Sequence, residues 1–302
     1  MIWGLGLAGV LGLVVLVGLG RELYTKACLN PKAKSFGGHF DLGEPEELRV
    51  LILGDQGSGD KKQQQVAAAM EQVAEREGCD LVLLLGDNFI QKGIKDLEDP
   101  QLQNKFEAVY SLNKPFYAVL GNHDFKGNWR AQIAYSEKST RWRMPAATYR
   151  LEVGPVCFDA LNTTCSLCSF FSLRKKTLRP WHIAFAHHPL VSTGRHGHML
   201  KSEQRFVVRS GIDAYLSGHH HLLEHIEYEG IDQITSGGGG TNLNEKAERP
   251  HPGKRFYLLD HGFVWAKYTA HTAEYRFYDK EAQEVYSFTR EKASEPAGGF
   301  GE

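Results

Sequence analysis

The sequence gathers five histidines in two short stretches, Ala186-His187-His188-Pro189 and Gly218-His219-His220-His221. Each stretch directly follows an apolar run, residues 181–185 in the first case and 214–217 in the second. Histidine is a common metal ligand, because a neutral imidazole offers a nitrogen lone pair. The two stretches therefore predict a metal site at the ends of two strands that the fold has to bring together.

Three further polar motifs lie upstream, and each also follows an apolar run. In chain order, the runs and their motifs are Leu48–Leu53 with Gly54-Asp55-Gln56-Gly57, Leu81–Leu85 with Gly86-Asp87-Asn88-Phe89, and Phe116–Leu120 with Gly121-Asn122-His123-Asp124. Short apolar runs of this kind are typical of buried strands. Open α/β sheets place their ligands at the carboxyl ends of strands, so we expect all five motifs at one edge.

The spacing of apolar residues indicates the fold class. Residues 61–77 have the period of a helix with one apolar face, and a second helix is predicted around residues 101–112. Several later runs, between residues 231 and 289, alternate with a period of two, which is typical of antiparallel strands with one wet face. The pattern predicts an α/β (α+β) protein, a two-sheet β-sandwich flanked by helices.

Composition excludes some classes of protein. The 302 residues are 42% hydrophobic and 24% charged, which is ordinary for a globular chain and excludes a disordered one. The net charge of −1 is nearly neutral, whereas nucleic-acid binding usually requires a basic patch or stripe. We therefore expect no nucleic-acid partner.

Residues 2–20 carry no charged side chain and are long enough to span a bilayer as a helix. No lysine or arginine precedes this run, as one would in a signal peptide, so we expect an uncleaved single-pass anchor, with a signal peptide as the alternative. Gly4, Ala8 and Gly12 form a ridge of small residues through which two such helices would pair as a homodimer. A glycine-rich span without pairing is the other interpretation.

The expected organisation has four parts. They are residues 1–22 as the transmembrane anchor or signal segment, 23–47 as a linker, 48–290 as the catalytic domain, and 291–302 as a tail. Four basic residues, Arg21, Lys26, Lys32 and Lys34, follow the apolar run. The positive-inside rule would place the domain after them in the cytosol.

Six side chains from the five motifs form the candidate ligand set. They are Asp55, Asp87, Asn122, His187, His219 and His221. Two carboxylates, one amide and three imidazoles suit a pair of first-row metal ions. Asp87 lies in the middle of the motif order and could bridge the ions, because a carboxylate has two oxygens. Such a pair would leave a strongly positive site, so an anionic substrate such as a phosphate ester is expected.

The five motifs, in this order and with these glycines, resemble the motif blocks of calcineurin-like metallophosphoesterases. They are most similar to the small purple acid phosphatase branch, and the resemblance covers residues 48 to 270 approximately. His196, nine residues after His187, matches a substrate-facing histidine of that branch, and Ser236–Gly240 matches its glycine-rich turn. The resemblance implies the four-layer metallophosphoesterase fold and an acid phosphatase-like hydrolase acting on phosphomonoesters. A phosphodiesterase, a pyrophosphatase and a membrane-anchored pseudoenzyme that binds a partner are the alternatives.

The resemblance also implies a role for each site residue. One metal would take Asp55, Asp87 and His221, and the other would take Asp87, Asn122, His187 and His219. The two ions would be iron paired with iron, zinc or manganese, and a metal-bound hydroxide would attack phosphorus in line. His123 and His196 would face the phosphate, one of them protonating the leaving oxygen. Asp124 would orient His123.

The sequence departs from this branch at one ligand. Purple enzymes carry a metal-binding tyrosine three residues after the bridging aspartate, and this chain has Ile90 there. Other branches carry a histidine two residues after the first aspartate, where this chain has Gly57. The first metal thus keeps three recognisable ligands, with water or Gln56 as candidates for the open position, and we expect no purple colour. Branch members are usually exported, which conflicts with the side of the membrane that the basic flank predicts.

Overall fold

The computed structural model describes residues 39–164, 173, 176–196, 199–243 and 250–292. The predicted span at residues 2–20 and the ridge formed by Gly4, Ala8 and Gly12 lie outside these residues. So do much of the predicted linker and nearly all of the tail. Within the part of the chain that is described, no helix has the length and hydrophobicity needed to cross a membrane.

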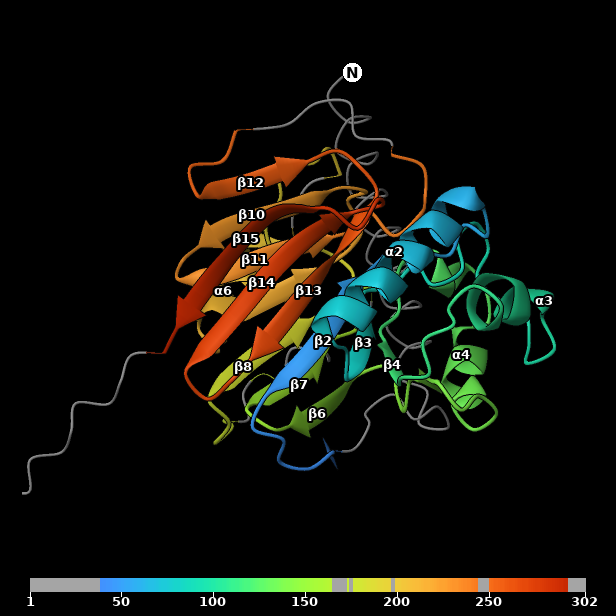
Figure 1. Cartoon of the computed structure of the whole chain (residues 1–302), viewed down its shortest axis with the longest axis horizontal. Helices are drawn as coiled ribbons and strands as arrows, with labels where there is room; N and C mark the ends of the chain where they lie inside the picture. The colour runs from blue at the N-terminus through green and yellow to red at the C-terminus, as the bar shows by residue number, and fades with distance from the viewer. Residues whose placement is uncertain (1–38, 165–172, 174–175, 197–198, 244–249, 293–302) are drawn as a thin grey trace, which may run out of the picture. The chain divides into compact units, whose positions relative to one another are not determined.

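Two mixed β-sheets form the body of the described unit (Figure 1). Sheet A contains, in spatial order, β1 (His39–Asp41), β6 (Tyr149–Val153), β7 (Val156–Ala160), β8 (Trp181–Phe185), β9 (Ala214–Ser217), β11 (Ile231–Ser236), β10 (Leu223–Tyr228) and β12 (Lys254–Leu258). Sheet B contains β15 (Glu284–Glu291), β14 (Thr272–Asp279), β13 (Gly262–Tyr268), β2 (Leu48–Leu53), β3 (Leu81–Leu84), β4 (Phe116–Ala118) and β5 (Trp142–Arg143). The predicted strands of both halves are confirmed within a few residues.

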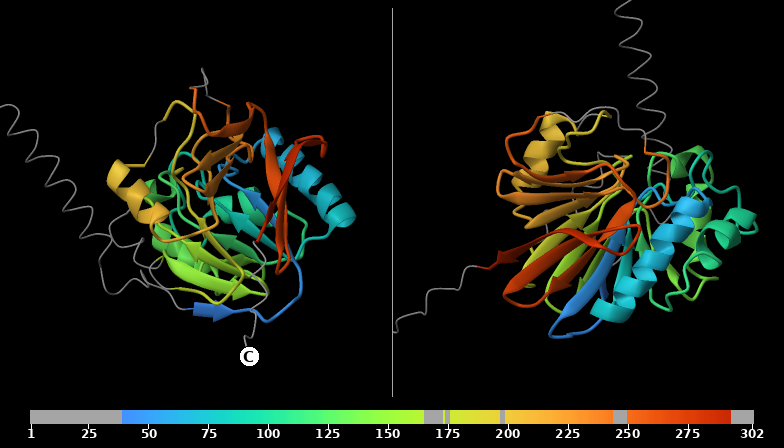
Figure 2. Two further views of the ribbon diagram at one scale, coloured as in Figure 1. Left: turned by 90° about the vertical axis from the view of Figure 1, so that its left-hand side faces the viewer. Right: turned by 45° about the horizontal axis from the view of Figure 1, so that its top comes forward.

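Helices cover the outer sides of the two sheets. The helical segments are α2 (Lys61–Glu77), α3 (Pro100–Leu102), the π-helical turn η1 (Gln103–Glu107), the 3₁₀ turn η2 (Asp124–Lys126), α4 (Trp129–Tyr135) and α6 (Lys201–Val208). In the left view of Figure 2, α2 and α6 lie on opposite sides with the sheets between them. The predicted sandwich of two sheets flanked by helices is therefore confirmed.

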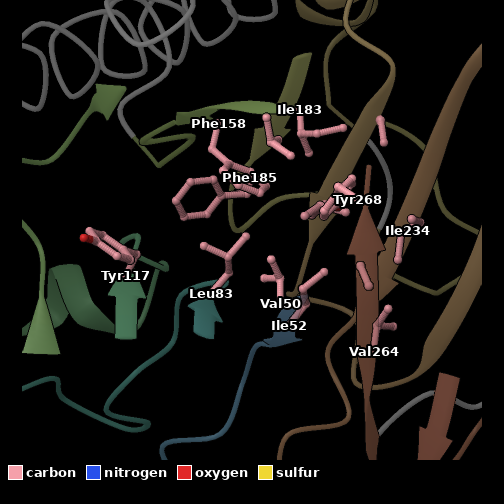
Figure 3. Close-up of a cluster of buried hydrophobic side chains, with 14 of the residues drawn as sticks. Val50, Ile52, Leu83, Tyr117, Phe158, Ile183, Phe185, Ile234, Val264 and Tyr268 are labelled. Carbon is pink, nitrogen blue, oxygen red and sulfur yellow. The ribbon is translucent and has the colours of Figure 1, made fainter. Parts of the chain in front are cut away.

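The core lies between the facing sides of the two sheets (Figure 3). Side chains alternate along each strand, so Phe158 and Ile183 of sheet A and Val50 and Leu83 of sheet B all point into this layer. All four are fully buried. The continuous apolar runs of β2, β3, β7 and β8 thus supply one face of each strand to the interface between the sheets.

The parallel strands decide where the polar motifs meet. In sheet B, β2, β3 and β4 are parallel neighbours, and in sheet A, β8 and β9 are parallel neighbours. Each of the five motifs begins within three residues of the carboxyl end of one of these strands. The expected placement of all five motifs at strand ends is confirmed.

The predicted helix at residues 101–112 differs from the structure. The segment forms only the short α3 and then the π-helical turn η1, which ends at Glu107. Arg141 donates from Nη2 to the carbonyl oxygen of Glu107 at 2.8 Å and from Nη1 to that of Tyr110. These contacts bind carbonyl groups that a continuing helix would have used. A residue about thirty positions away therefore ends the helix, which local spacing does not reveal.

Truncation of one core side chain tests this packing. We expect Leu83→Ala to lower the free energy of unfolding by about 2–5 kcal/mol, because it removes a fully buried side chain and leaves a cavity between the sheets. Urea denaturation followed by circular dichroism measures the change. The matched control is Leu259→Ala, where the side chain is 39% exposed and a much smaller change is expected. Equal losses in the two variants would contradict the placement of the core.

Candidate metal centre

Three residues of the candidate ligand set have a left-handed backbone. The φ angles of Asp55, Asp87 and His219 are 58°, 52° and 70°. A residue with a Cβ atom loses about 1–2 kcal/mol in this conformation, because Cβ approaches the following carbonyl oxygen. Such strain persists where the surrounding structure imposes it, and it concentrates at functional sites. Its occurrence at three neighbouring strand ends indicates a site at this edge.

Two glycines allow the motifs to approach one another. A Cβ atom on Gly218 would lie 2.5 Å from Oδ2 of Asp55, and one on Gly121 would lie 2.2 Å from Oδ1 of Asp87. Both distances are too short for any side chain. Gly218 follows a strand of sheet A, whereas Asp55 follows a strand of sheet B. Gly218 is therefore required for the two sheets to close at Asp55, and Gly121 allows two neighbouring loops of sheet B to close at Asp87.

His187 connects the two halves of the site. Its Nδ1 lies 3.0 Å from the carbonyl oxygen of Leu85, which can only accept, so Nδ1 carries the proton and Nε2 presents a lone pair. This Nε2 lies 3.0 Å from Oδ1 of Asn122, 3.5 Å from Oδ1 of Asp87 and 3.2 Å from Nδ1 of His219. Two nitrogens and two oxygens thus converge, an arrangement that a cation satisfies.

His221 and Asp55 form a second convergence. Nδ1 of His221 donates to the carbonyl oxygen of Asn242 at 2.7 Å, which leaves Nε2 facing Oδ1 of Asp55 at 3.5 Å. The other oxygen of Asp55 accepts the backbone N–H of His219 at 2.7 Å. Oδ1 of Asp55 is buried and has no hydrogen-bond partner among the described residues. A buried carboxylate oxygen without a donor is a position that a metal ion would fill.

The titration of these groups shows that the centre attracts positive charge. Burial opposes a charge on His221, but the Asp55 carboxylate outweighs it and raises the pKa of His221 to about 9. Burial, together with the charge of Asp55, raises the pKa of Asp87 above its usual range in spite of His187. The His221 imidazolium beside Asp55 thus supplies positive charge at this buried edge.

Two groups of buried side chains bring three potential ligand atoms within 4.8 Å of one another, namely Asp55 with Asp87 and His187, and Cys157 with Asp159 and His182. In the second group, Arg150 donates to both oxygens of Asp159, at 3.0 and 2.7 Å, and so neutralises it. In the first group, neither aspartate forms an ion pair with a lysine or arginine within the described ranges. The charge balance therefore favours metal ions at the first group only.

His123 lies beside this group. The backbone N–H of Gln91 donates to its Nδ1 at 3.1 Å, so a neutral ring carries its proton on Nε2. The ammonium group of Lys126 lies 3.2 Å from Nδ1 and 3.3 Å from Nε2. Burial and the charge of Lys126 lower the pKa of His123. The His123 backbone N–H also donates to Asp87 at 2.8 Å, which ties this loop to the centre.

Asp124 does not orient the ring of His123 as predicted. Its fully buried carboxylate instead accepts the backbone N–H groups of Gly121, Asn88 and Phe89, at 2.8, 3.2 and 3.2 Å. The Asp124 carboxylate holds two motif loops together, because it accepts backbone N–H groups that these loops do not pair among themselves. Burial and the nearby Asp87 raise the pKa of Asp124 to about 6.

His196 reaches the cluster from a separate loop. Its ring centroid lies 5.3 Å from that of His219 and 5.5 Å from that of His220, and the residue is exposed. The structure thus brings His196 beside the candidate ligands, on the solvent side. A substrate approaching from solvent would meet this ring.

Neither Gly57 nor Ile90 can supply the further ligand that related proteins carry at these two positions. A Cβ atom on Gly57 would lie 2.2 Å from the carbonyl oxygen of Asn88, so no histidine fits there. Ile90 is half-buried and offers no donor atom. Gln56 donates from Nε2 to Oδ1 of Asn88 at 3.0 Å, and its buried Oε1 has no partner within the described residues. Gln56 therefore has one oxygen available next to Asp55.

Sequence reasoning missed the groups that orient the histidines. The carbonyl oxygens of Leu85 and Asn242 fix the tautomers of His187 and His221. Main-chain carbonyl groups carry no residue signature, and Asn242 is twenty-one positions from its partner. These two positions could not have been found from residue types.

Comparison with known proteins places this arrangement among phosphoesterases. A family model described as calcineurin-like phosphoesterase matches residues 48–223, a range that contains all six candidate ligands. The chain is similar to Purple acid phosphatase 3 of Arabidopsis thaliana, with 30% identity over 280 residues that cover 77% of this chain and 74% of that protein. It is 33% identical to tartrate-resistant acid phosphatase type 5 of Homo sapiens over 242 residues, covering 65% and 74% respectively.

The fold is also similar to that of a solved structure. "GAP50 the anchor in the inner membrane complex of Plasmodium" superposes with a TM-score of 0.74 and 23% identity, covering 83% of this chain and 90% of that one. At this identity the similarity supports the fold alone.

Removal of one carboxylate tests which of the two groups of buried side chains binds metal. We expect Asp87→Asn to weaken metal binding at least about tenfold, because the charge that lies between the two convergences is lost. Metal content after dialysis, measured by mass spectrometry of the elements, checks this. The matched control is Asp159→Asn, a buried carboxylate already paired with Arg150, which should leave the metal content unchanged. Metal loss in the control alone would reassign the centre.

Proposed function

Because the chain belongs to the calcineurin-like phosphoesterase family, we propose that it hydrolyses phosphomonoesters at a centre for two metal ions. One observation carries this proposal: two buried aspartates meet Nε2 of His187 and of His221 without a lysine or arginine partner in the described chain. A monoester dianion brings more charge to two cations than a diester does, so the centre favours monoesters.

The proposed ligands divide around Asp87. Asp55, Asp87 and His221 would hold one ion, and Asp87, Asn122, His187 and His219 would hold the other. Asp87 follows β3, which lies between β2 and β4 in the sheet, so it is placed to serve both. The oxygen and nitrogen donors suit iron paired with iron, zinc or manganese. When bound, the two ions would supply an activated water and neutralise charge on the phosphate oxygens.

His123 is the proposed proton donor to the leaving oxygen. Because the Gln91 N–H donates to Nδ1, Nε2 is the ring nitrogen of His123 that would hold the proton for transfer. Lys126, beside the same ring, attracts the negative charge of the substrate. His196 would contact the phosphate from the solvent side, next to His219. Gln56, with its free Oε1, is the proposed substitute for the tyrosine that Ile90 replaces.

A partner-binding protein without catalysis is the second candidate. The loss of the tyrosine ligand at Ile90 favours it. The retained histidines at positions 123 and 196 favour catalysis, because a binding surface has no need for groups that face a phosphate. The two candidates differ in turnover and are separated below.

We further propose that residues 2–20 anchor the chain as a single span and that residues 48–290 form the catalytic domain. The family points to an extracytosolic domain and the basic flank to a cytosolic one. Protease accessibility on intact cells distinguishes the two orientations.

Turnover of two matched substrates tests the function. We expect the purified full chain, loaded with iron, zinc or manganese in turn, to hydrolyse p-nitrophenyl phosphate with a kcat/KM at least about tenfold above that for bis(p-nitrophenyl) phosphate. The Asp87→Asn variant provides the inactive background. Faster hydrolysis of the diester would favour a phosphodiesterase. No hydrolysis with any metal would favour the partner-binding alternative.

The dependence of kcat on the leaving group tests the role of His123 as proton donor. We expect His123→Gln to lower kcat for an alkyl phosphate by about 10²–10⁴-fold, because an alkoxide must be protonated as it leaves. The loss for p-nitrophenyl phosphate should be far smaller, since nitrophenolate leaves without a proton. The control is His271→Gln, an exposed histidine on the turn between β13 and β14. Equal losses on both substrates would exclude His123 as the proton donor.

A further inference from the structure

A cavity lies outside the candidate metal centre, beside α6. Its volume is about 570 Å³, and its lining residues are Leu173, Lys176, Ser202, Arg205, Phe206, Arg209 and Ser210. None of them belongs to the five polar motifs. Helix α6 lies on the outer side of sheet A, on the opposite side of the sheets from α2 (Figure 2). The phosphatase chemistry proposed above makes no use of this cavity.

The cavity is built from one face of a helix. Ser202, Arg205, Phe206 and Arg209 are spaced three and four residues apart, so they share one face of α6 and its carboxyl end. Leu173 approaches this face from a distant part of the chain, and it packs in the apolar cluster under α6 to which Phe206 also belongs. The cavity thus has an apolar floor and a polar rim.

The rim carries positive charge only. Lys176, Arg205 and Arg209 line the cavity, and no aspartate or glutamate is among the described lining residues. None of the three cations forms an ion pair within the described ranges, and the carboxylate of Glu203 is turned to the backbone N–H of Leu200 at 2.9 Å. Three unpaired cations around one cavity repel one another, so an anionic ligand would relieve an unfavourable arrangement.

The chemistry of the rim favours phosphate. Arginine presents a planar fork of donors that matches phosphate oxygens, and two arginines one helical turn apart can grip one group. Ser202 and Ser210 add hydroxyl groups at the same rim. A phosphate group would therefore find both charge and directed donors here.

Two exposed leucines lie close in sequence to residues that line the cavity. Leu178 is fully exposed, two residues after Lys176, and Leu200 is 54% exposed, two residues before Ser202. Large apolar side chains that project into solvent beside a basic cavity are characteristic of surfaces that contact lipid. The ligand is thus expected to carry an apolar part as well as a phosphate.

We propose that this cavity binds the phosphate headgroup of an anionic lipid, a phosphomonoester with acyl chains. Arg205, Arg209 and Lys176 contact the phosphate, and Phe206 contacts the glyceryl portion. Leu178 and Leu200 lie against neighbouring acyl chains. The uncharged residues 2–20 would place the domain at a membrane surface, where such a ligand is abundant. The cavity shares no residue with the candidate metal centre, so the inference stands apart from the proposal for catalysis.

Binding of a short-chain lipid tests this inference. The intact chain is held in a neutral detergent with a chelator, so that no lipid is hydrolysed, and its affinity for dioctanoyl phosphatidic acid is measured by microscale thermophoresis. We expect Arg205→Gln/Arg209→Gln to weaken the affinity at least about tenfold, since charge-assisted hydrogen bonds are lost. Phosphatase activity of the metal-loaded variant should remain that of the wild type.

Three controls make the outcome decisive. Arg76→Gln changes an arginine in the last turn of α2, as Arg205 lies in the last turn of α6, and should bind as the wild type does. Dioctanoyl phosphatidylcholine should bind far more weakly than phosphatidic acid. Glycerol 3-phosphate should also bind more weakly; equal affinity would overturn the lipid assignment in favour of a soluble phosphate. Wild-type affinity in the double variant, or an equal loss in Arg76→Gln, would overturn the cavity as the site.

Discussion

The Nδ1–H of His187 donates to the carbonyl oxygen of Leu85 at 3.0 Å, and this contact joins the end of β8 in sheet A to the end of β3 in sheet B. A second contact, from the backbone N–H of His219 to Asp55 at 2.7 Å, joins β9 to β2 in the same way. The metal centre exists only where the two sheets meet. Core packing between the sheets holds these strand ends in register, because a shift of either sheet would separate the pairs.

The buried carboxylates explain why the centre requires cations. Asp159, elsewhere in sheet A, is as buried as Asp55, but the guanidinium of Arg150 neutralises it. Asp55 and Asp87 have no such partner in the part of the chain described, and left-handed backbones hold them close together. Their mutual repulsion in a place with little water must be offset by positive charge. That requirement is the physical link between this fold and phosphate chemistry.

Some predictions failed where distant groups compete for the same atoms. The helix expected to continue to residue 112 ends at Glu107, because Arg141 binds the carbonyl groups there. The family resemblance implied that Asp124 orients His123, but its carboxylate accepts the backbone N–H groups of two loops instead. In both cases a side chain, Arg141 or Asp124, forms hydrogen bonds with backbone groups that are close in space but not adjacent in sequence.

The sequence alone determined the strands, the order of the five motifs and the residue types of the ligand set. Apolar runs and glycines are local signals, because strand periodicity and tight turns depend on immediate neighbours. Only the tertiary structure decided which atoms of His187 and His221 face the carboxylates, since the carbonyl groups that set their tautomers come from distant residues. The basic cavity beside α6 likewise had no signature in sequence. It exists because residues 173 and 176 pack near a helix that begins twenty-five residues after Lys176, and such contacts depend on the whole fold.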